Sequence, residues 1–237
     1  MPQVCETCHG PIAPHGSRAD TPVPASWAMK KTAAEKSAPC LACHTGSLTQ
    51  HWAGSVHDGR DVGCTDCHRM HPEGTPVAGL PAKVDEVETC VSCHQSVKAS
   101  VWRTSRHPVR EGRMFCSGCH NPHGTLADAQ LIRATVNETC LTCHAEKRGP
   151  FLWTHPPAAE NCLSCHVAHG GVNDHLLKVK PPRLCHSCHS EPDHVGVPHN
   201  SLHQTHYAPD RFTFNNGCAD CHQVHGSNSP SGATLLR

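Results

Sequence analysis

Hydrophobic residues occur along this chain only in short runs, and none of them keeps a helical or strand period for long. The clearest helical patterns cover residues 27–36, 83–90 and 126–140, although β-branched residues weaken the last one. Loops rich in proline and glycine, such as residues 72–81, separate these patterns. Alternation of apolar and polar residues, which would indicate strands, is missing. We therefore predict a mostly irregular chain with short α-helices and essentially no sheet.

The composition offers little material for an ordinary protein core. Only 37% of the 237 residues are hydrophobic and 4% aromatic, while proline and glycine number 20 and 18. Such a chain buries too little apolar surface to offset the loss of chain entropy on folding. It has 18 cysteines and 24 histidines, however, which are residues that hold cofactors and metals. We expect bound cofactors to supply most of the core.

All 18 cysteines fall into nine CxxCH pentads, the attachment signature of c-type haem. A histidine after each of nine CxxC pairs would arise by chance on the order of once in a billion chains. A disulfide framework would not need these histidines, and zinc sites need four ligands for each metal. The cysteines predicted to bind nine haems c are Cys5, Cys8, Cys40, Cys43, Cys64, Cys67, Cys90, Cys93, Cys116, Cys119, Cys140, Cys143, Cys162, Cys165, Cys185, Cys188, Cys218 and Cys221. The predicted proximal iron ligands are His9, His44, His68, His94, His120, His144, His166, His189 and His222.

The pentads alternate between two kinds. The pentads at Cys40, Cys90, Cys140 and Cys185 lack a histidine three residues after their last residue, whereas those at Cys64, Cys116, Cys162 and Cys218 have one. This alternation predicts a two-haem repeat, in which each unit contacts mainly its neighbours, and so an elongated haem wire. The predicted segments are a single-haem segment with a linker (1–39) and four two-haem modules (40–89, 90–139, 140–184 and 185–237).

Segments beyond the pentads carry a family resemblance. Four segments resemble the MtrA/DmsE/PioA family. They are HAEKRGPFLWTHPPAAENCLSCHVAHGGVNDHLLK, CHGPIAPH, HNPHGTLADAQL and the terminal HGSNSPSGATLLR. Its members are periplasmic decahaem cytochromes that thread a porin-type β-barrel in the outer membrane. This chain has nine pentads, and the first motif of the family is the one missing. The resemblance implies a multihaem cytochrome c that conducts electrons between the periplasm and the cell exterior.

The resemblance also implies the second ligand of each iron. The positions that match distal ligands of the family are His15, His57, His71, His107, His123, His155, His169, His194 and His225. In the last module the repeat itself favours His206 over His194, so both remain candidates. Iron with two histidine ligands has no open position and favours electron transfer over substrate chemistry.

A steric argument predicts how these ligands are shared. A histidine three residues after a pentad lies near the face that the pentad histidine already occupies, so it should ligate the other haem of its own module. Histidines such as His57, His107 and His155 would then ligate the second haem of their module. Applied to the N-terminus, this rule leaves the Cys5 haem without a regular distal ligand. His15, a partner chain or no sixth ligand are the options there.

Charge and localisation complete the prediction. The formal charge is zero, but haem propionates would add up to about eighteen negative charges. No basic run indicates nucleic acid, and no apolar run is long enough for a transmembrane helix. Covalent haem attachment occurs outside the cytoplasm, so we expect an exported, periplasmic protein associated with the outer membrane. No signal peptide is visible, which suggests a mature, truncated or renumbered chain.

The expected partners are a porin-type β-barrel and other cytochromes, with no nucleic acid. Alternative functions are an electron-transfer subunit of another respiratory or photosynthetic assembly, or of an extracellular haem filament. A reductase would need an open iron or an altered pentad, and every pentad here ends in histidine. We therefore expect no enzymatic activity.

Overall fold

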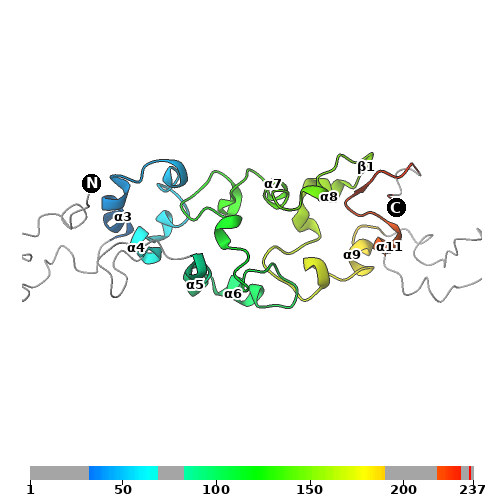
Figure 1. Ribbon diagram of the computed structural model, residues 1–237, viewed down its shortest axis with the longest axis horizontal. Coiled ribbons are helices and arrows are strands. Elements are labelled where there is room, and N and C mark those ends of the chain that lie inside the picture. Colours follow the sequence, from blue (N-terminus) through cyan, green and yellow to red (C-terminus); the bar gives the residue numbers. More distant parts are fainter. Residues whose placement is uncertain (1–31, 69–82, 190–217, 231–234, 236–237) are drawn as a thin grey trace, which may run out of the picture. The chain divides into compact units, whose positions relative to one another are not determined.

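The computed structural model describes residues 32–68, 83–189, 218–230 and 235. Short helices and turns alternate with irregular chain, and the sheet found in these residues has two strands (Figure 1). β1 (Trp153–Thr154) runs antiparallel to β2 (Gly226–Ser227). The α-helices are α3 (Ala33–Leu41), α4 (Cys64–Cys67), α5 (Lys83–Cys93), α6 (Gln95–Val101), α7 (Val136–Cys140), α8 (Pro156–Glu160), α9 (Arg183–His186) and α11 (Cys218–Cys221). The predicted fold class, mostly irregular with short helices, is confirmed.

Short 3₁₀ turns supply much of the remaining regular structure. They occupy Ser47–Thr49, Asp58–Arg60, Cys116–Gly118, Asp128–Gln130, Ala145–Lys147, Cys162–Ser164 and Asp174–Leu176. Two of these turns begin at the first cysteine of a pentad, whereas the first cysteine of every other described pentad lies in an α-helix. The pentads are thus part of the regular secondary structure and are not confined to the loops.

The helices depart from the sequence-based prediction in one important place. The helix predicted over residues 126–140 is wrong for most of its length, because only α7 at its end is α-helical. Ala129 and Gln130 have left-handed backbone angles, with φ of 52° and 55°. There the chain reverses direction and returns towards its pentad, His120 pairing with Leu131 in an antiparallel bridge. This tertiary pairing overrides the helix propensity of the segment.

The chain divides into two compact units. The first contains Met1–His94 and Gly112–Ala134, and the second contains Gln95–Glu111 and Thr135–Arg237. Each unit is therefore assembled from two separate stretches of chain. The four two-haem modules remain a prediction from the sequence repeat.

Neither unit has a conventional hydrophobic core in its described residues. The buried hydrophobic residues there are Ala33, Trp52, Val91 and Val101. By contrast, Leu126 is 91% exposed. Four small or isolated side chains contribute too little apolar burial to stabilise chains of this length. The fold therefore requires apolar material from outside the polypeptide, as its composition predicts.

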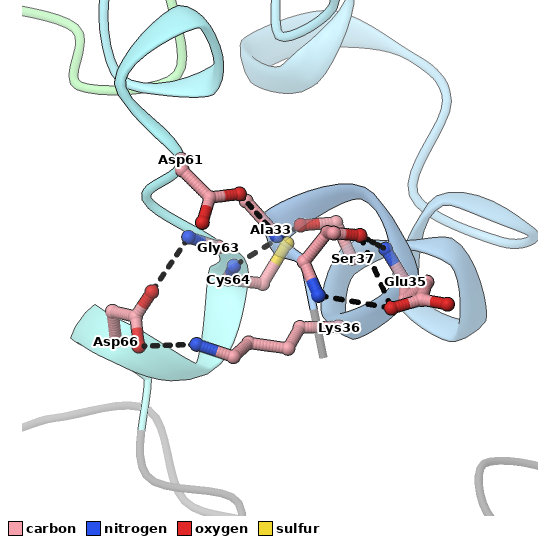
Figure 2. A network of polar contacts seen from close by, with 9 residues as sticks. Ala33, Glu35, Lys36, Ser37, Asp61, Gly63, Cys64 and Asp66 are labelled. Atoms are coloured by element: carbon pink, nitrogen blue, oxygen red, sulfur yellow. Dashed lines mark hydrogen bonds and ion pairs between the residues drawn. The ribbon is translucent and has the colours of Figure 1, made fainter. Parts of the chain in front are cut away.

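Polar side chains dock successive pentads against each other. In the first unit, the Ser37 hydroxyl on α3 accepts a hydrogen bond from the Cys64 N–H at 3.3 Å (Figure 2). In return, a carboxylate oxygen of Asp61 accepts the Ala33 N–H, an otherwise unpaired donor at the start of α3, at 2.7 Å. These reciprocal contacts fix the Cys64 pentad on α4 against the helix that carries Cys40.

The same device recurs in the later pentads. On α5, the Glu86 carboxylate accepts hydrogen bonds from the backbone N–H and the hydroxyl of Ser117, at 2.6 and 2.9 Å. The Asn137 side chain on α7 accepts the Cys162 N–H at 2.7 Å. In all three cases, a polar residue shortly before one pentad caps the start of the next. Consecutive haem attachment sites are thus held together by the polypeptide itself.

Candidate haem sites

Each described pentad forms one helical turn. The backbone N–H of the pentad histidine donates to the carbonyl of the first cysteine, at distances between 2.8 and 3.0 Å. This turn brings two thiols and one imidazole to neighbouring positions on the same short segment. The bonds join His44 to Cys40, His68 to Cys64, His94 to Cys90, His120 to Cys116, His144 to Cys140, His166 to Cys162, His189 to Cys185 and His222 to Cys218.

Thiols of successive pentads lie within electrostatic reach of one another. A hydrogen bond with Cys90 lowers the pKa of the Cys116 thiol to about 7 and raises the pKa of Cys90 itself. Burial, followed by a hydrogen bond with Cys218, raises the pKa of Cys185 to about 11. Because each thiol belongs to a predicted haem attachment site, these neighbouring attachment sites lie close together.

Five pentad histidines each face a second histidine from a distant part of the chain. The ring centroids of these pairs are separated by 5.9 to 6.3 Å. In three pairs the ring planes are inclined by 24° to 65°, and in two they are nearly parallel, at 8° and 9°. The inclined pairs are His94 with His57, His144 with His107 and His189 with His155; the parallel pairs are His68 with His123 and His166 with His225.

This separation fits a metal ion between the rings. A metal–imidazole bond is about 2.0 Å long, and a ligating nitrogen lies roughly 1.1 Å from its ring centre. Two imidazoles on opposite sides of one iron therefore have centroids about 6 Å apart. The five pairs match this requirement although they come from different helices, turns and loops. The residues present fit haem iron with two axial histidines.

Hydrogen bonds to the backbone leave the Nε2 atom of several of these rings available for a metal. His57 Nδ1 contacts the Pro122 carbonyl at 2.8 Å, and His155 Nδ1 contacts the Val224 carbonyl at 2.7 Å. His107 makes the same contact with the Ala168 carbonyl, at 3.1 Å. A carbonyl can only accept, so Nδ1 carries the proton and Nε2 keeps a free lone pair. Such contacts also orient a ligating imidazole and raise its basicity.

Two pentad histidines have the same kind of anchor. His120 Nδ1 contacts the Ala129 carbonyl and His166 Nδ1 contacts the His175 carbonyl, both at 2.8 Å. Ala129 and His175 have positive φ angles of 52° and 56°, an uncommon conformation for residues with a side chain. The strained reversal thus delivers a carbonyl oxygen to the ring that needs a fixed orientation.

Burial keeps two further imidazoles neutral. It lowers the pKa of His123 below its ordinary value, and the nearby His68 and His57 lower it further. Burial is also the main cause of the lowered pKa of His225, with smaller contributions from Lys147, His166 and His155. A metal binds only the neutral form of imidazole. Both rings are therefore kept in the form required for binding at neutral pH.

The arrangement of the pairs corrects the steric argument made from the sequence. That argument joined each histidine to a haem of its own predicted module, whereas His57 faces His94 of the following module. Likewise, His123 faces His68 of the preceding module. The loop after a pentad turns away from it, so its histidine reaches another pentad instead of the neighbouring face of the same haem.

Several predicted site residues lie outside the described residues. They are Cys5, Cys8, His9, His15, His71 and His194, together with the alternative ligand His206. The expectation of an irregular Cys5 haem falls on them too, and it loses its basis because the pairing argument behind it is wrong. Cys221 is described only as part of α11.

Sequence reasoning missed the groups that aim the imidazoles. The carbonyls of Pro122, Ala168 and Val224 all directly precede the histidine that follows a pentad by three residues. Every residue has a backbone carbonyl, so the sequence does not show which carbonyl accepts a hydrogen bond from a histidine. The only available signal was the recurrence of an aspartate and a leucine in LADAQL and VNDHLL, at the two reversals.

Glycines were a second missed feature. Gly124 and Gly170 each directly follow such a histidine, and both have positive φ angles. A methyl group on Gly124 would collide with the carbonyl of His51, and one on Gly170 with the carbonyl of Ser100. The close approach of two backbones therefore requires glycine after these histidines.

Comparisons with known proteins identify the same haem-binding motifs. Residues 5–93 match the family model of NrfB-like c-type cytochromes. Residues 107–149 and 155–194 match the doubled CXXCH motif. The chain is 43% identical over 237 residues, 98% of its length, to the multihaem cytochrome MtrA of Shewanella baltica (strain OS185), and it covers 70% of that relative. It binds haem c, and it belongs to the MtrA family of multihaem c-type cytochromes, which are electron-transfer proteins and not enzymes.

Proposed function

We propose that this chain holds nine haems c, each with two axial histidines, and conducts electrons along them through the outer membrane. The observation that carries this proposal is the set of five histidine pairs with centroids about 6 Å apart, the spacing of two imidazoles on one iron. Bound haem iron supplies the electron transfer by alternating between its ferric and ferrous forms.

The protein's own residues would bind the haems, orient the ligating imidazoles and shield the iron from other ligands. The cysteines of each pentad would anchor one haem, and the pentad histidine would bind its iron. A histidine from another part of the chain would be the second ligand and would exclude water or substrate from the iron. Backbone carbonyls fix the protonated Nδ1 of the anchored rings and so keep their ligation geometry constant during electron transfer.

The same pattern extends to the remaining pentads. In the described pairs, a histidine three residues after a pentad faces the preceding pentad of the same kind. This rule assigns His169 to the haem at His120, and it assigns His71 to the haem at His9 if the lone Cys5 pentad belongs to the same kind. It leaves His15 and either His194 or His206 for the haems at His44 and His222. Nine haems then share eighteen histidines, with no iron left open.

A porin-type β-barrel is the proposed membrane partner. No described helix has the length and apolar character needed to cross a bilayer. Membership of the MtrA family supports a location in the periplasm at the outer membrane, with the barrel as a sheath and other cytochromes as donor and acceptor. Electrons would then pass between the periplasm and the cell exterior through the haems, while the barrel provides the lipid-facing surface.

Two measurements test the proposal. The haem content per chain, from the absorbance of the pyridine adduct and from intact mass, is expected to be nine. A redox dye enclosed in vesicles should be reduced by an external reductant only when both the barrel and the cytochrome are present in the membrane. A lower haem count would contradict the cofactor assignment. Dye reduction without the cytochrome, or none with both proteins, would contradict the transmembrane route.

A further inference from the structure

The loop that follows the Cys116 pentad serves two other pentads at once. Its Pro122 carbonyl accepts the Nδ1–H of His57, the ring that faces His94. The next residue, His123, places its own ring opposite His68. A small displacement of this loop would therefore disturb the axial imidazoles of two haems together.

The Asn121 side chain holds this loop in place. Its Oδ1 atom accepts a hydrogen bond from the His123 N–H at 3.1 Å. Its Nδ2 group donates to the carbonyls of Gly124 and Leu48, both at 3.0 Å. One amide group thus ties both ends of the loop together and attaches it to the segment that leads to His57.

His123 depends on this support more than the anchored histidines do. Its Nδ1 atom is buried and has no hydrogen-bond partner among the described residues. The orientation of its ring therefore rests on the position of its backbone, which Asn121 holds. The anchored rings, such as His57, have a carbonyl partner of their own.

The sister loop in the second unit lacks this clamp. Gln223 occupies the position of Asn121 after the Cys218 pentad, and its exposed side chain forms no hydrogen bond within the described part of the chain. Nevertheless, Val224 offers its carbonyl to His155, and His225 faces His166. The chain itself thus provides a matched comparison with and without the amide clamp.

We propose that Asn121 is a positioning residue that fixes the axial imidazoles of two haems together, those at His68 and His94, and that it thereby sets the reduction potential of the His94 haem. The proposal rests on the proposed function, because it requires both irons to have two axial histidines. Loss of the clamp lets the Pro122 carbonyl move away from His57. An imidazole without its Nδ1–H acceptor is a weaker donor and stabilises ferric iron less, so the potential of the His94 haem rises. The His123 ring, without its support, turns out of its parallel alignment with His68.

The test compares Asn121→Val with Gln223→Val in the fully loaded protein. A neutral hydrogen bond changes an equilibrium about five-fold, which is about 40 mV for a one-electron couple. Redox titration of Asn121→Val should therefore show one haem shifted upward by about this amount. Electron paramagnetic resonance should show a simultaneous change in one signal from parallel and one from inclined imidazole planes. Gln223→Val should leave the titration and the spectrum unchanged.

A third variant separates clamping from folding. Asn121→Asp keeps an acceptor for the His123 N–H but turns a charged oxygen, which cannot donate, towards the carbonyls of Gly124 and Leu48. The two spectral signals that change in Asn121→Val should therefore change in this variant too. Unchanged potentials and spectra in Asn121→Val, or equal shifts in Gln223→Val, would overturn the proposal. Failure of the proposed function would look different, because the wild-type spectrum itself would then show high-spin iron at the paired sites.

Discussion

The haem sites with inclined rings and the site at His166, where the rings are parallel, are built in opposite ways. At His94, His144 and His189 the pentad histidine has no backbone acceptor among the described residues, and the facing histidine carries the anchor. At His166 the pentad histidine is anchored to the His175 carbonyl, while the facing His225 is held by burial. The inclined pairs belong to the first construction, and the parallel pair of His166 belongs to the second.

This difference shows that the two imidazoles at one iron are oriented by different parts of the structure. A single anchored imidazole fixes the orientation of one axial ligand, and the backbone that carries the other ring fixes the second. In the second construction, the facing His225 belongs to a loop whose Gly226 packs against the side chain of Phe151, which leaves the ring little freedom. In the first construction, the facing ring turns to meet its carbonyl, so its plane follows the acceptor instead of the pentad ring.

The largest expected effect comes from removing the facing histidine. His57→Ala should leave the His94 iron five-coordinate, giving one high-spin haem and one carbon monoxide-binding site per chain, with loss of a signal from inclined planes. His225→Ala should have the same optical effect but remove a signal from parallel planes. The control is His51→Ala, because the His51 ring contacts the Gln50 side chain and faces no pentad histidine among the described residues. This variant should keep every haem low-spin. If His57→Ala removed a parallel signal instead, the pairing would be wrong.

The next effect concerns the close backbone contact that positions the facing ring. Gly124→Ala places a methyl group against the His51 carbonyl at a φ of 103°, and it should destabilise the folded protein by about 3 kcal/mol. A denaturant titration, monitored by the haem absorbance, measures this loss in the free energy of unfolding. Gly46→Ala is the control, because a methyl group there would contact nothing. Equal stability of the two variants would show that the contact does not constrain the loop.

A smaller effect is expected where consecutive pentads dock. Asn137→Ala leaves the Cys162 N–H without its acceptor and the carbonyls of Ala158 and Ala159 without their donor. The expected loss is about 2 kcal/mol in the free energy of unfolding. Asn161→Ala removes only one exposed cap on Leu163 and should cost about 1 kcal/mol. The reverse order would mean that Asn137 does not join the two pentads.

The smallest effect concerns an exposed ion pair at the equivalent docking site of the first unit. Lys36 and Asp66 lie 3.3 Å apart and are partly exposed to solvent (Figure 2). Lys36→Met should change the free energy of unfolding by less than about 0.5 kcal/mol. The difference should disappear in about 1 M salt, which screens exposed charges. A large effect at low salt that disappears in high salt would show that the pair, and not the Ser37 and Asp61 hydrogen bonds, holds α3 against α4.

Local chemistry made much of this protein predictable from its sequence. A CxxCH pentad attaches haem within five residues, so Cys116, Cys119 and His120 could be assigned without a fold. Low hydrophobic content and dense proline and glycine predicted short helices in an irregular chain. Family motifs such as HNPHGTLADAQL extended the assignment to a set of candidate distal histidines.

Only the tertiary structure decided which histidine faces which. The partners His57 and His94, or His166 and His225, are separated by tens of residues, and nothing in their local sequence marks the match. The pairing depends on where the loops run after each pentad and on which carbonyl each Nδ1–H meets. A backbone reversal such as the one at Ala129, where the chain folds back on its own pentad against the helix propensity of the sequence, likewise aims a carbonyl at the His120 ring.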